Sequence, residues 1–523
     1  MIMHKNLLIT GFGVIGTEVF YQIIKKNKSH KLNITVLEKN YSNFPGGIAY
    51  SSYKSRFGFF NNPLRLSNDD FQKWVKKSSV QIKLIKLFKA EKKLNLENWL
   101  KKNTLGNLNK FKNINELYLP RLTYSIFLEE KFFKAYKILE KKKFIKVNFL
   151  EGELIKVSKL KNTKKYLCYV NKNFRKKKII YQNEKIFIKN LTQKKQRILK
   201  TDSLILGLGI LPPSNINSIK PFKDKNYIHD FYASGATNNL FKKLKKIQKL
   251  KEIIVAFIGN KAGLLETMQE FENLDKKILK KIKIISISSS SFSLEKAELS
   301  KNFENYKFKY LTTKKILKIK RAEEILSFIK SEFKNGIKKK FSKYDIWTLI
   351  LKKNLLEKCI KKLSMGEKKN YNDKVFSQLR KLTRYTYPDT VNSKIRLEKR
   401  KILINYNDKV FDLKKLKNKI LLKTKKGRNI LVNIVVNVSG PVPLSKNYKE
   451  VPCINSLKEI CKNYNERGFI SDQYNQIGKK IYAPGTLSSN FNPNRKTIIK
   501  SITQNCIISA SHIIKCLRNQ NEY

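Results

Sequence analysis

Three glycines near the N-terminus have the spacing of a phosphate-binding turn. Gly11, Gly13 and Gly16 follow the apolar run LLIT in the order G-x-G-x-x-G, and a helical pattern begins at Thr17. The first glycine permits a tight turn, the second lets the backbone approach a pyrophosphate, and the third lets helix and strand pack closely. Glu38 ends the next β-type run, ITVLE, where an acidic side chain could bind ribose hydroxyl groups. This combination predicts a dinucleotide whose phosphates lie at the helix N-terminus.

A second glycine turn follows the β-type run VAFI in the stretch VAFIGNKAGLLE. Gly259 and Gly263 flank Lys261, which stands where a phosphate-binding turn has its second glycine. A lysine side chain there should keep the backbone away from a pyrophosphate, whereas its ammonium group could bind phosphate directly. The next strand ends in SISSSS and supplies no arginine to select a 2′-phosphate. The pattern predicts a second nucleotide domain and leaves open whether NADH, NADPH or neither binds there.

The elements that must position these turns can be expected from apolar periodicity. Residues 1–60 alternate strand, turn, helix and strand, and residues 69–145 have apolar residues at helical spacing. Residues 146–203 contain short β-type runs between lysine-rich turns, which predict an antiparallel meander. Strand, turn, helix and strand recur from residue 251, helices fill much of 310–385, and NILVNIVVNVSGP is a buried strand ending in glycine. We therefore expect an α/β protein.

Length and composition set limits on the class of protein. The chain has 523 residues, of which 41% are hydrophobic and 11% aromatic, so we expect a globular protein of two or three domains. It contains no uncharged apolar run of about 18 residues, which a membrane-spanning helix would need. The N-terminus has no small-residue cleavage site after its apolar run, so we expect a cytoplasmic protein. The six cysteines and four histidines are scattered, so no metal site is expected.

The charge of the chain raises the possibility of nucleic-acid binding. Lysine and arginine number 112 against 40 acidic residues, for a formal net charge of +72. The excess is mainly lysine, spread over every region and mixed with asparagine and isoleucine, as an A/T-rich coding sequence would produce. No arginine-rich stripe or aromatic platform for stacked bases is present. We therefore attribute the charge to composition, and expect it to favour anionic ligands through attraction that weakens with salt.

Further motifs carry a resemblance to a known family. Adjacent glycines in FPGGIAYSS are typical of backbone that passes close to a planar ligand. With the first turn and the following FNNPLRLSNDDFQKWV, this segment resembles the FAD/NAD(P)-binding family that includes urate hydroxylase-like and aspartate N-monooxygenase-like flavoenzymes. YLPRLTYSIFLEE resembles the family's Pro-Arg-x-x-Tyr segment. LILGLGILPP and VVNVSGPVP resemble strands that re-enter the flavin domain, and IYAPGTLSSN resembles the segment that reaches the isoalloxazine.

The resemblance implies a set of cofactor-binding residues drawn from most of the chain. FAD would lie at Gly11, Gly13, Gly16, Glu38, Gly47, Ala49, Tyr50, Asn62, Arg121, Gly209, Gly440 and Gly485. Arg121 would contact a flavin phosphate or the substrate, with a solvated surface arginine as the alternative. NADPH or NADH would lie at Gly259, Lys261 and Gly263. The chain departs from the family's usual Ala-Thr-Gly at residues 207–209 and 438–440, although both segments keep the final glycine.

The resemblance also implies the architecture. It indicates two dinucleotide-binding (Rossmann-like) domains, the second inserted into a discontinuous FAD domain. The expected boundaries are 1–250 for the first part of the FAD domain, 251–432 for the inserted NAD(P)-binding-like domain, and 433–523 for the C-terminal part of the FAD domain.

The implied activity is an FAD-dependent monooxygenase. A nicotinamide cofactor would reduce the flavin, O₂ would form a flavin hydroperoxide, and oxygen would pass to a small polar molecule, with an acidic molecule as one option. The altered second turn keeps open an alternative, a flavin-dependent dehydrogenase or reductase that does not use NAD(P)H. A basic nucleic-acid-binding protein without flavin is the third alternative, and it rests on charge alone.

Overall fold

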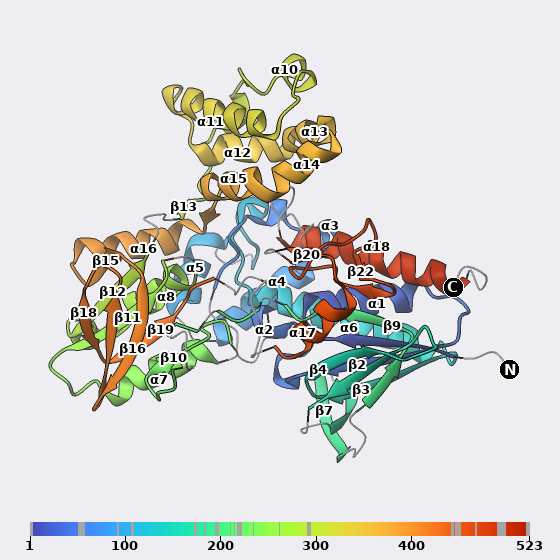
Figure 1. The fold of residues 1–523 in the computed structure, drawn as a ribbon. Coiled ribbons are helices and arrows are strands. Elements are labelled where there is room, and N and C mark those ends of the chain that lie inside the picture. The colour runs from blue at the N-terminus through green and yellow to red at the C-terminus, as the bar shows by residue number, and fades with distance from the viewer. Residues whose placement is uncertain are drawn as a thin grey trace.

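The computed structural model describes most of the chain. The described residues are 4–50, 58–91, 94–105, 109–171, 175–182, 185–193, 198–209, 211–213, 215–216, 222–233, 235–260, 262–289, 294–440, 444, 451–465, 468–488 and 498–518. They form three bodies: a first unit around a large sheet, a second unit around a smaller parallel sheet, and a helical unit of residues 299–382 (Figure 1).

The first unit is built on an eight-stranded sheet in the order β22-β23-β9-β1-β2-β3-β6-β7. Its strands are β1 (Lys5–Thr10), β2 (Leu32–Glu38), β3 (Ile145–Glu151), β6 (Arg175–Gln182), β7 (Lys185–Gln193), β9 (Ser203–Leu206), β22 (Gln476–Gly478) and β23 (Ile481–Tyr482). The strands from β23 to β3 are parallel, and β22, β6 and β7 pair antiparallel at the two edges. The buried residues of β1 and β2 form near-continuous apolar runs, as expected for parallel strands covered on both faces.

One face of this sheet is covered by α1 (Val14–Lys26), α6 (Leu122–Glu140) and α18 (Ile498–Arg518). The terminal helix α18 therefore packs against the first helix of the chain, and Ile502, Cys506 and Ala510 join the core of β1 and β2. The other face packs against α17 (Cys453–Ile460) and a small antiparallel sheet of β4 (Leu154–Lys159), β5 (Tyr166–Val170) and β8 (Ile198–Thr201).

The predicted meander of residues 146–203 is split between two sheets. β4, β5 and β8 pair antiparallel, as do β6 and β7, but β3 pairs parallel with β2 from Leu32↔Ile145 to Glu38↔Glu151. A single β-type run carries no information on the direction of its partner, which is why the sequence did not predict the parallel pairing.

Shorter elements complete the first unit and confirm the helical expectation for residues 69–145. The helices are α2 (Gly47–Tyr50), α3 (Asp69–Val75), α4 (Ser78–Ala90) and α5 (Leu94–Asn103). Short 3₁₀ turns are η1 (Tyr41–Asn43), η2 (Leu64–Leu66) and η4 (Ile114–Glu116), and β20 (Tyr464–Asn465) pairs with β21 (Gly468–Phe469). Aromatic side chains, including Phe71, Trp74 and Trp99, fill a separate core between these helices and α6.

The second unit has a five-stranded parallel sheet in the order β10-β19-β11-β12-β15. Its strands are β10 (Tyr227–Ile228), β11 (Ile253–Ile258), β12 (Ile282–Ser288), β15 (Leu403–Asn407) and β19 (Ile434–Asn437). The helices α7 (Ala236–Lys246), α8 (Ala262–Glu272), α9 (Lys276–Leu279) and α16 (Pro388–Lys399) complete the core on one face. The antiparallel strands β16 (Val410–Leu416), β17 (Lys419–Thr424) and β18 (Asn429–Val432) cover the other face.

The second sheet extends beyond the boundaries expected from the sequence. β10 precedes residue 251 and β19 follows residue 432, yet β19 pairs between β10 and β11. The strand that resembles a return to the flavin domain therefore lies in the second sheet. Its run IVVN is buried throughout and would fit either sheet, so the sequence could not assign its partners.

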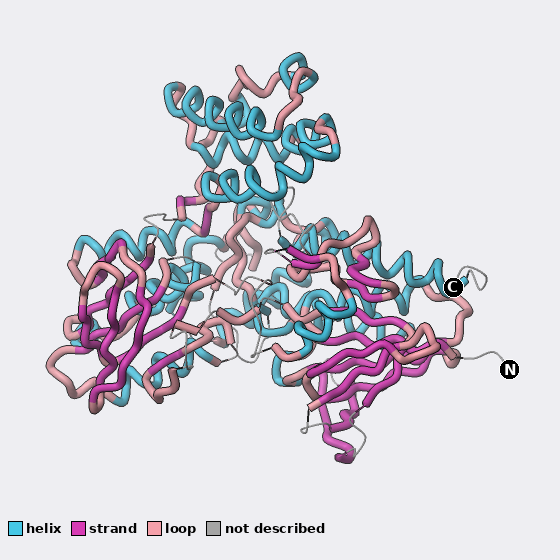
Figure 2. Tube along the Cα trace, in the orientation of Figure 1, coloured by secondary structure: helices cyan, strands magenta, loops and turns pink. Residues whose placement is uncertain are grey.

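The helical unit projects from the second unit at the top of the view in Figure 1, and Figure 2 shows it to be almost free of strands. Its helices are α10 (Thr313–Leu317), α11 (Ala322–Lys338), α12 (Lys343–Lys352), α13 (Leu355–Lys362), α14 (Met365–Asn370) and α15 (Phe376–Leu382), with η5 (Phe303–Asn305) and a π-turn η6 (Tyr371–Val375). The parallel pair β13 (Glu295–Lys296) and β14 (Tyr385–Thr386) connects it to the second unit.

Within the described part of the chain, none of the helices combines the length and apolar character needed to cross a membrane. The His, Cys, Asp and Glu side chains of the described residues do not gather in groups of three that could hold a metal ion.

Candidate functional site

The first glycine turn lies directly between β1 and α1. Gly11 has a φ of +76°, which favours glycine, and a Cβ at this position would lie 2.3 Å from the carbonyl oxygen of Gly207. A Cβ on Gly16 would lie 2.3 Å from the oxygen of Gly11, so helix and strand approach as the motif predicts. The turn therefore has the predicted geometry, and Gly207 at the end of β9 is part of it.

The start of α1 has no side-chain cap. Gly13 is the N-cap residue, and the first turn of the helix contains no acidic residue. Backbone N–H groups at such a helix start, together with the helix dipole, favour a phosphate group. This is the feature of the described residues that fits the pyrophosphate of FAD.

Glu38 is held at the end of β2 by the turn itself. Its carboxylate is 9% exposed and accepts hydrogen bonds from the backbone N–H groups of Phe12 (2.7 Å) and Asn40 (3.0 Å). Burial raises the pKa of Glu38, and these backbone hydrogen bonds oppose that rise. The carboxylate therefore fixes the shape of the glycine turn, and the ribose contact stays a prediction.

The second predicted glycine segment packs on the start of α1. Gly47 has a φ of +66°, and a Cβ there would lie 2.8 Å from the Cα of Gly13. Thr17 donates a hydrogen bond to the carbonyl of Pro45 at 2.7 Å, which ties the segment to the helix. Ala49 in the next helix, α2, is exposed, so backbone and small side chains line the surface beside the first turn.

Tyr50 ends α2 and is enclosed by aromatic rings. Its ring centroid lies 5.9 Å from that of Phe60 and 5.0 Å from that of Tyr124. Burial raises the pKa of Tyr50, so its hydroxyl group stays protonated at neutral pH. Asn62 follows in the same segment and is partly buried.

Segments distant in sequence meet at the same place. Gly209, with a φ of +74°, accepts a hydrogen bond through its carbonyl from the hydroxyl of Thr486 at 2.8 Å. A Cβ on Gly485 would lie 2.3 Å from Cδ1 of Ile15 in α1. The end of β9 and the C-terminal segment are thus brought together beside the first turn, and the cofactor contacts of Gly209 and Gly485 stay predictions.

Gly440 follows β19, the strand that lies beside β11 in the second sheet. The neighbouring Val438 lies against the second glycine turn, where a Cβ on Gly259 would be 3.0 Å from the carbonyl oxygen of Val438. The contact of Gly440 with the flavin stays a prediction.

The second turn keeps the strand–turn–helix geometry. Gly259 has a φ of +113°, and its N–H donates to the carbonyl of Ile287 at 2.8 Å. Gly263 lies in α8, where a Cβ would be 3.0 Å from the hydroxyl of Tyr232. Lys261 lies outside the described residues.

Arg121 is largely buried, so it is not a solvated surface arginine, and its contact with a flavin phosphate or the substrate stays a prediction. Its guanidinium is 14% exposed and forms an ion pair and hydrogen bond with the carboxylate of Glu266 in α8. Its Nε also donates to the carbonyl of Phe59 at 3.3 Å. Burial by itself lowers the pKa of Arg121, but Glu266, Tyr50 and Tyr232 together outweigh burial, and the pKa is raised.

Sequence reasoning missed Glu266, although it ends the quoted stretch VAFIGNKAGLLE. The only signal is an acidic residue in an otherwise apolar helical stretch. Its partner lies 145 positions away, and nothing local identifies it.

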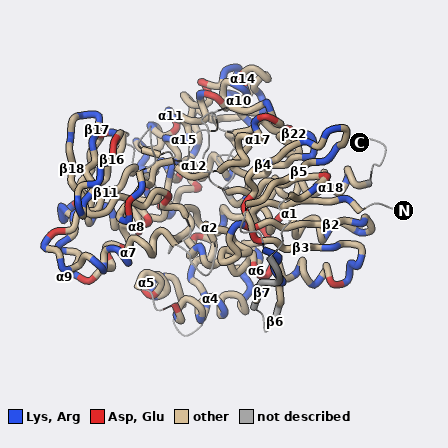
Figure 3. The backbone as a smooth tube through the Cα atoms, turned by 60° about the horizontal axis from the view of Figure 1, so that its bottom comes forward, with Lys and Arg blue, Asp and Glu red and all other residues tan. Residues whose placement is uncertain are grey.

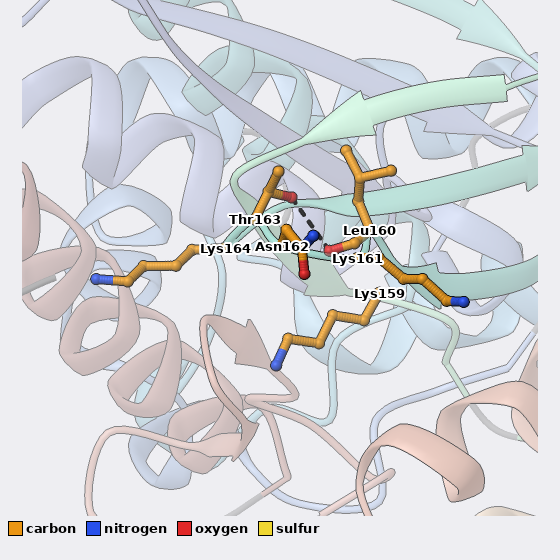
Figure 4. Close-up of a pocket in the computed structure, with 6 residues that line it drawn as sticks. All are labelled: Lys159, Leu160, Lys161, Asn162, Thr163 and Lys164. Atoms are coloured by element: carbon orange, nitrogen blue, oxygen red, sulfur yellow. Dashed lines mark hydrogen bonds between the residues drawn. The ribbon is translucent and has the colours of Figure 1, made fainter.

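A surface hollow at the turn between β4 and β5 is separate from these residues. It is lined by Lys159, Leu160, Lys161, Asn162, Thr163 and Lys164 (Figure 4). Lysine side chains point outward from it, and the Thr163 hydroxyl donates to the Leu160 carbonyl at 3.2 Å. These residues form a solvated turn and contribute nothing to the glycine site.

Comparisons with known proteins agree with this arrangement. Residues 8–178 match a family model described as FAD-NAD(P)-binding. The whole chain is similar to the ornithine N-hydroxylase of Kutzneria sp. 744, solved with reduced FAD, NADP⁺ and L-ornithine, at 11% identity and a TM-score of 0.51, covering 99% of this chain and 100% of that chain. At this identity the likeness shows a shared fold.

Two further solved structures have lower TM-scores. The lysine monooxygenase NbtG of Nocardia farcinica has 8% identity and a TM-score of 0.45, covering 96% of this chain and 100% of that chain. The thioredoxin reductase of Lactococcus lactis has 8% identity and a TM-score of 0.43, covering 98% and 99%. No protein with a curated description matches the sequence.

Proposed function

We propose that the protein is an FAD-dependent monooxygenase, a proposal supported by the match of residues 8–178 to the FAD-NAD(P)-binding family model. The observation that carries the proposal is the convergence of Gly11, Gly47, Gly207 and Gly485 around the uncapped start of α1. Four described segments of the chain thus bring glycine backbone to the place where a pyrophosphate and a planar ring would lie.

The residues of the first unit would bind and orient the cofactor. The N–H groups at the start of α1 would hold the pyrophosphate. Glu38 would fix the glycine turn and would also accept hydrogen bonds from ribose hydroxyl groups. The aromatic packing around Tyr50 would exclude water on one side. When bound, FAD supplies the redox chemistry, taking up a hydride and delivering electrons to O₂.

The second unit would hold the nicotinamide dinucleotide at the turn of Gly259 and Gly263. This assignment is supported by a parallel strand, a glycine with positive φ and a following helix, in the same order as in the first turn. In this proposal the FAD domain is discontinuous, and the inserted nucleotide domain includes β10 and β19 with the rest of their sheet. The substrate would be a small polar molecule with a nucleophilic atom.

An anaerobic titration tests the cofactor assignment. Protein loaded with FAD is mixed with NADH or with NADPH while the absorbance of oxidised flavin is followed. We expect bleaching with at least one of the two, and reoxidation when O₂ is admitted. A colourless protein that cannot be reconstituted with FAD would contradict the whole proposal.

An aerobic assay with substrate separates the monooxygenase from a reductase or dehydrogenase. A monooxygenase consumes NAD(P)H and O₂ faster when its substrate is present and places oxygen in the product. Reduction of the flavin by a substrate in the absence of NAD(P)H would instead identify a dehydrogenase, the alternative that the lysine at position 261 keeps open.

A further inference from the structure

The ion pair of Arg121 and Glu266 joins the first unit to the second. Arg121 is the N-cap residue of α6, and Glu266 lies in the second turn of α8. The two side chains are 14% and 9% exposed. The backbone N–H of Arg121 donates to the Gly58 carbonyl at 2.9 Å, and a Cβ on Gly58 would lie 3.4–3.5 Å from both partners of the pair. The pair is therefore enclosed on the side of the first unit.

Each partner is coupled to one of the two glycine turns. On the first side, α6 packs along α1, where Lys131 forms a buried ion pair with Glu18 at 2.6 Å. On the second side, Glu266 is three residues after Gly263, and the Thr267 hydroxyl donates to the Gly263 carbonyl at 2.6 Å. A contiguous set of packed elements thus runs from the first turn through the ion pair to the second turn.

A second ion pair between the units is more exposed to solvent. Lys102 in α5 and Asp389 in α16 form an ion pair at 3.5 Å, and their side chains are 66% and 32% exposed. Such exposed pairs contribute little, because water screens the charges and the side chains remain free to move. The stabilisation by a buried ion pair depends on good hydrogen-bond geometry. Removing one partner is costly, because the other charge then stays buried without compensation.

We propose that Arg121 and Glu266 are positioning residues, whose ion pair fixes the angle at which the second glycine turn faces the first. This inference rests on the proposed function, in which a nicotinamide from the second unit must lie against the flavin of the first. A displacement of about 1 Å at reacting atoms costs on the order of a hundredfold in rate. The raised pKa of Arg121 means that its guanidinium stays charged at neutral pH.

The position of the units can be measured without cofactor or activity. Nitroxide labels are placed at Lys28→Cys in the first unit and Lys280→Cys in the second, both exposed, in a Cys516→Ser background, since the other five cysteines are buried. Pulsed electron paramagnetic resonance gives the distribution of distances between the labels. We expect a narrow distribution in the parent, a broad or displaced one in Glu266→Gln and Arg121→Gln, and the parent distribution in the control Lys102→Ala.

Flavin reduction supplies the second readout. At saturating nicotinamide, Glu266→Gln should slow anaerobic flavin reduction about 10- to 100-fold, while the nicotinamide concentration for half-maximal rate changes little. Glu266→Asp, which keeps the charge, should recover part of the rate. FAD absorbance and the melting temperature of each variant confirm that the variant is folded and loaded.

Opposite results would overturn the inference. If the Gln variants keep the parent distance distribution, the pair does not position the units. If Glu266→Gln raises only the half-saturating nicotinamide concentration, the residue contributes to uniform binding and not to positioning. Should the parent flavin not be reduced by NADH or NADPH, the proposed function fails, and the distance distributions alone decide whether the pair orients the units.

Discussion

At the scale of single residues, the site depends on polar groups whose environment is set by burial. Glu38 has a buried carboxylate that receives two backbone hydrogen bonds, and Arg121 has a guanidinium that meets a carboxylate from another unit. In each case the charged side chain forms its hydrogen bonds with other groups of the protein. It would therefore act on a ligand through the shape of the turn or interface that it holds in place.

Replacement of Glu38 by Gln tests its role in the first turn. Hydrogen bonds to a charged acceptor contribute about 1.5–3 kcal/mol, more than those to a neutral one. We therefore expect the FAD dissociation constant of Glu38→Gln to rise about tenfold or more, which corresponds to about 1.4 kcal/mol. Titration with FAD, followed by quenching of flavin fluorescence, measures the change.

Glu153 supplies a matched control. It pairs with Lys39 at 2.8 Å in a solvated ion pair at the same end of the sheet. Because exposed pairs contribute little, Glu153→Gln should bind FAD like the parent protein. If the Glu38→Gln variant and the parent protein bound FAD with equal affinity, Glu38 would not contribute to FAD binding.

His512 in α18 predicts a dependence of stability on pH. Burial lowers the pKa of His512 below its ordinary value of 6.5, and its ring accepts or donates a hydrogen bond with Tyr482 at 3.0 Å. Since the folded state binds the proton less readily than the unfolded state, stability is present above pH 6.5 and is lost as the pH falls through the lowered pKa.

We expect His512→Gln to lose less stability than the parent protein between pH 7 and pH 5. Urea denaturation at a series of pH values measures the difference between the two proteins. If the unfolding free energies of the two proteins changed equally with pH, the pKa of His512 would not be lowered in the folded state.

At the scale of elements, glycines determine how strands and helices meet around the site. Gly207 ends β9 and touches the turn after β1, and Gly485 touches the start of α1. Strands β1 and β9 are parallel neighbours, so their carboxyl ends lie at the same edge of the sheet. That edge is where ligands bind in open α/β sheets.

A Cβ at Gly207 should disrupt this edge. It would lie 2.5 Å from the oxygen of Gly11 and 2.8 Å from that of Thr10, and both are backbone atoms that cannot move independently. Gly207→Ala should cost about 1–3 kcal/mol of unfolding free energy and should weaken FAD binding. Chemical denaturation and FAD titration measure the two effects.

Gly366 in α14 is the control for this substitution. A Cβ there meets nothing within 4 Å, and alanine is a better helix former than glycine. Gly366→Ala should therefore leave FAD binding unchanged and raise the stability by about 0.5 kcal/mol. If Gly207→Ala and Gly366→Ala lost similar amounts of stability and FAD affinity, the close backbone contact at Gly207 would not be the cause of the loss.

At the scale of the whole molecule, three bodies share one chain. Lysine and arginine are distributed over all of them, without a stripe along one face of the backbone (Figure 3). This distribution fits a compositional origin of the net charge of +72. The helical unit has its own core, to which Ile325, Ile329 and Leu349 from α11 and α12 contribute, and it meets the first unit through Tyr118.

The helical unit should fold alone. Its buried apolar side chains contact one another across α10 to α15, so most of its core is complete without the two sheets. We expect residues 298–384, expressed as a separate protein, to have a helical circular dichroism spectrum and to melt cooperatively. A broad, non-cooperative transition would show that docking against Tyr118 is required for its stability.

The sequence by itself determined the local parts of the site. The spacing of Gly11, Gly13 and Gly16 after an apolar run predicted strand, turn and helix, and Glu38 was correctly expected at the end of the next strand. These features depend on backbone sterics and periodicity within a few residues, which is why a sequence contains them. The mixed α/β class follows in the same way.

Only the tertiary structure decided which distant segments meet. It placed β19 between β10 and β11 and paired Arg121 with Glu266. A buried apolar strand fits any parallel sheet, and an arginine can pair with any carboxylate that packing brings within reach. The partner is selected by how all the elements pack together, and that is a property of the folded chain and not of any local pattern.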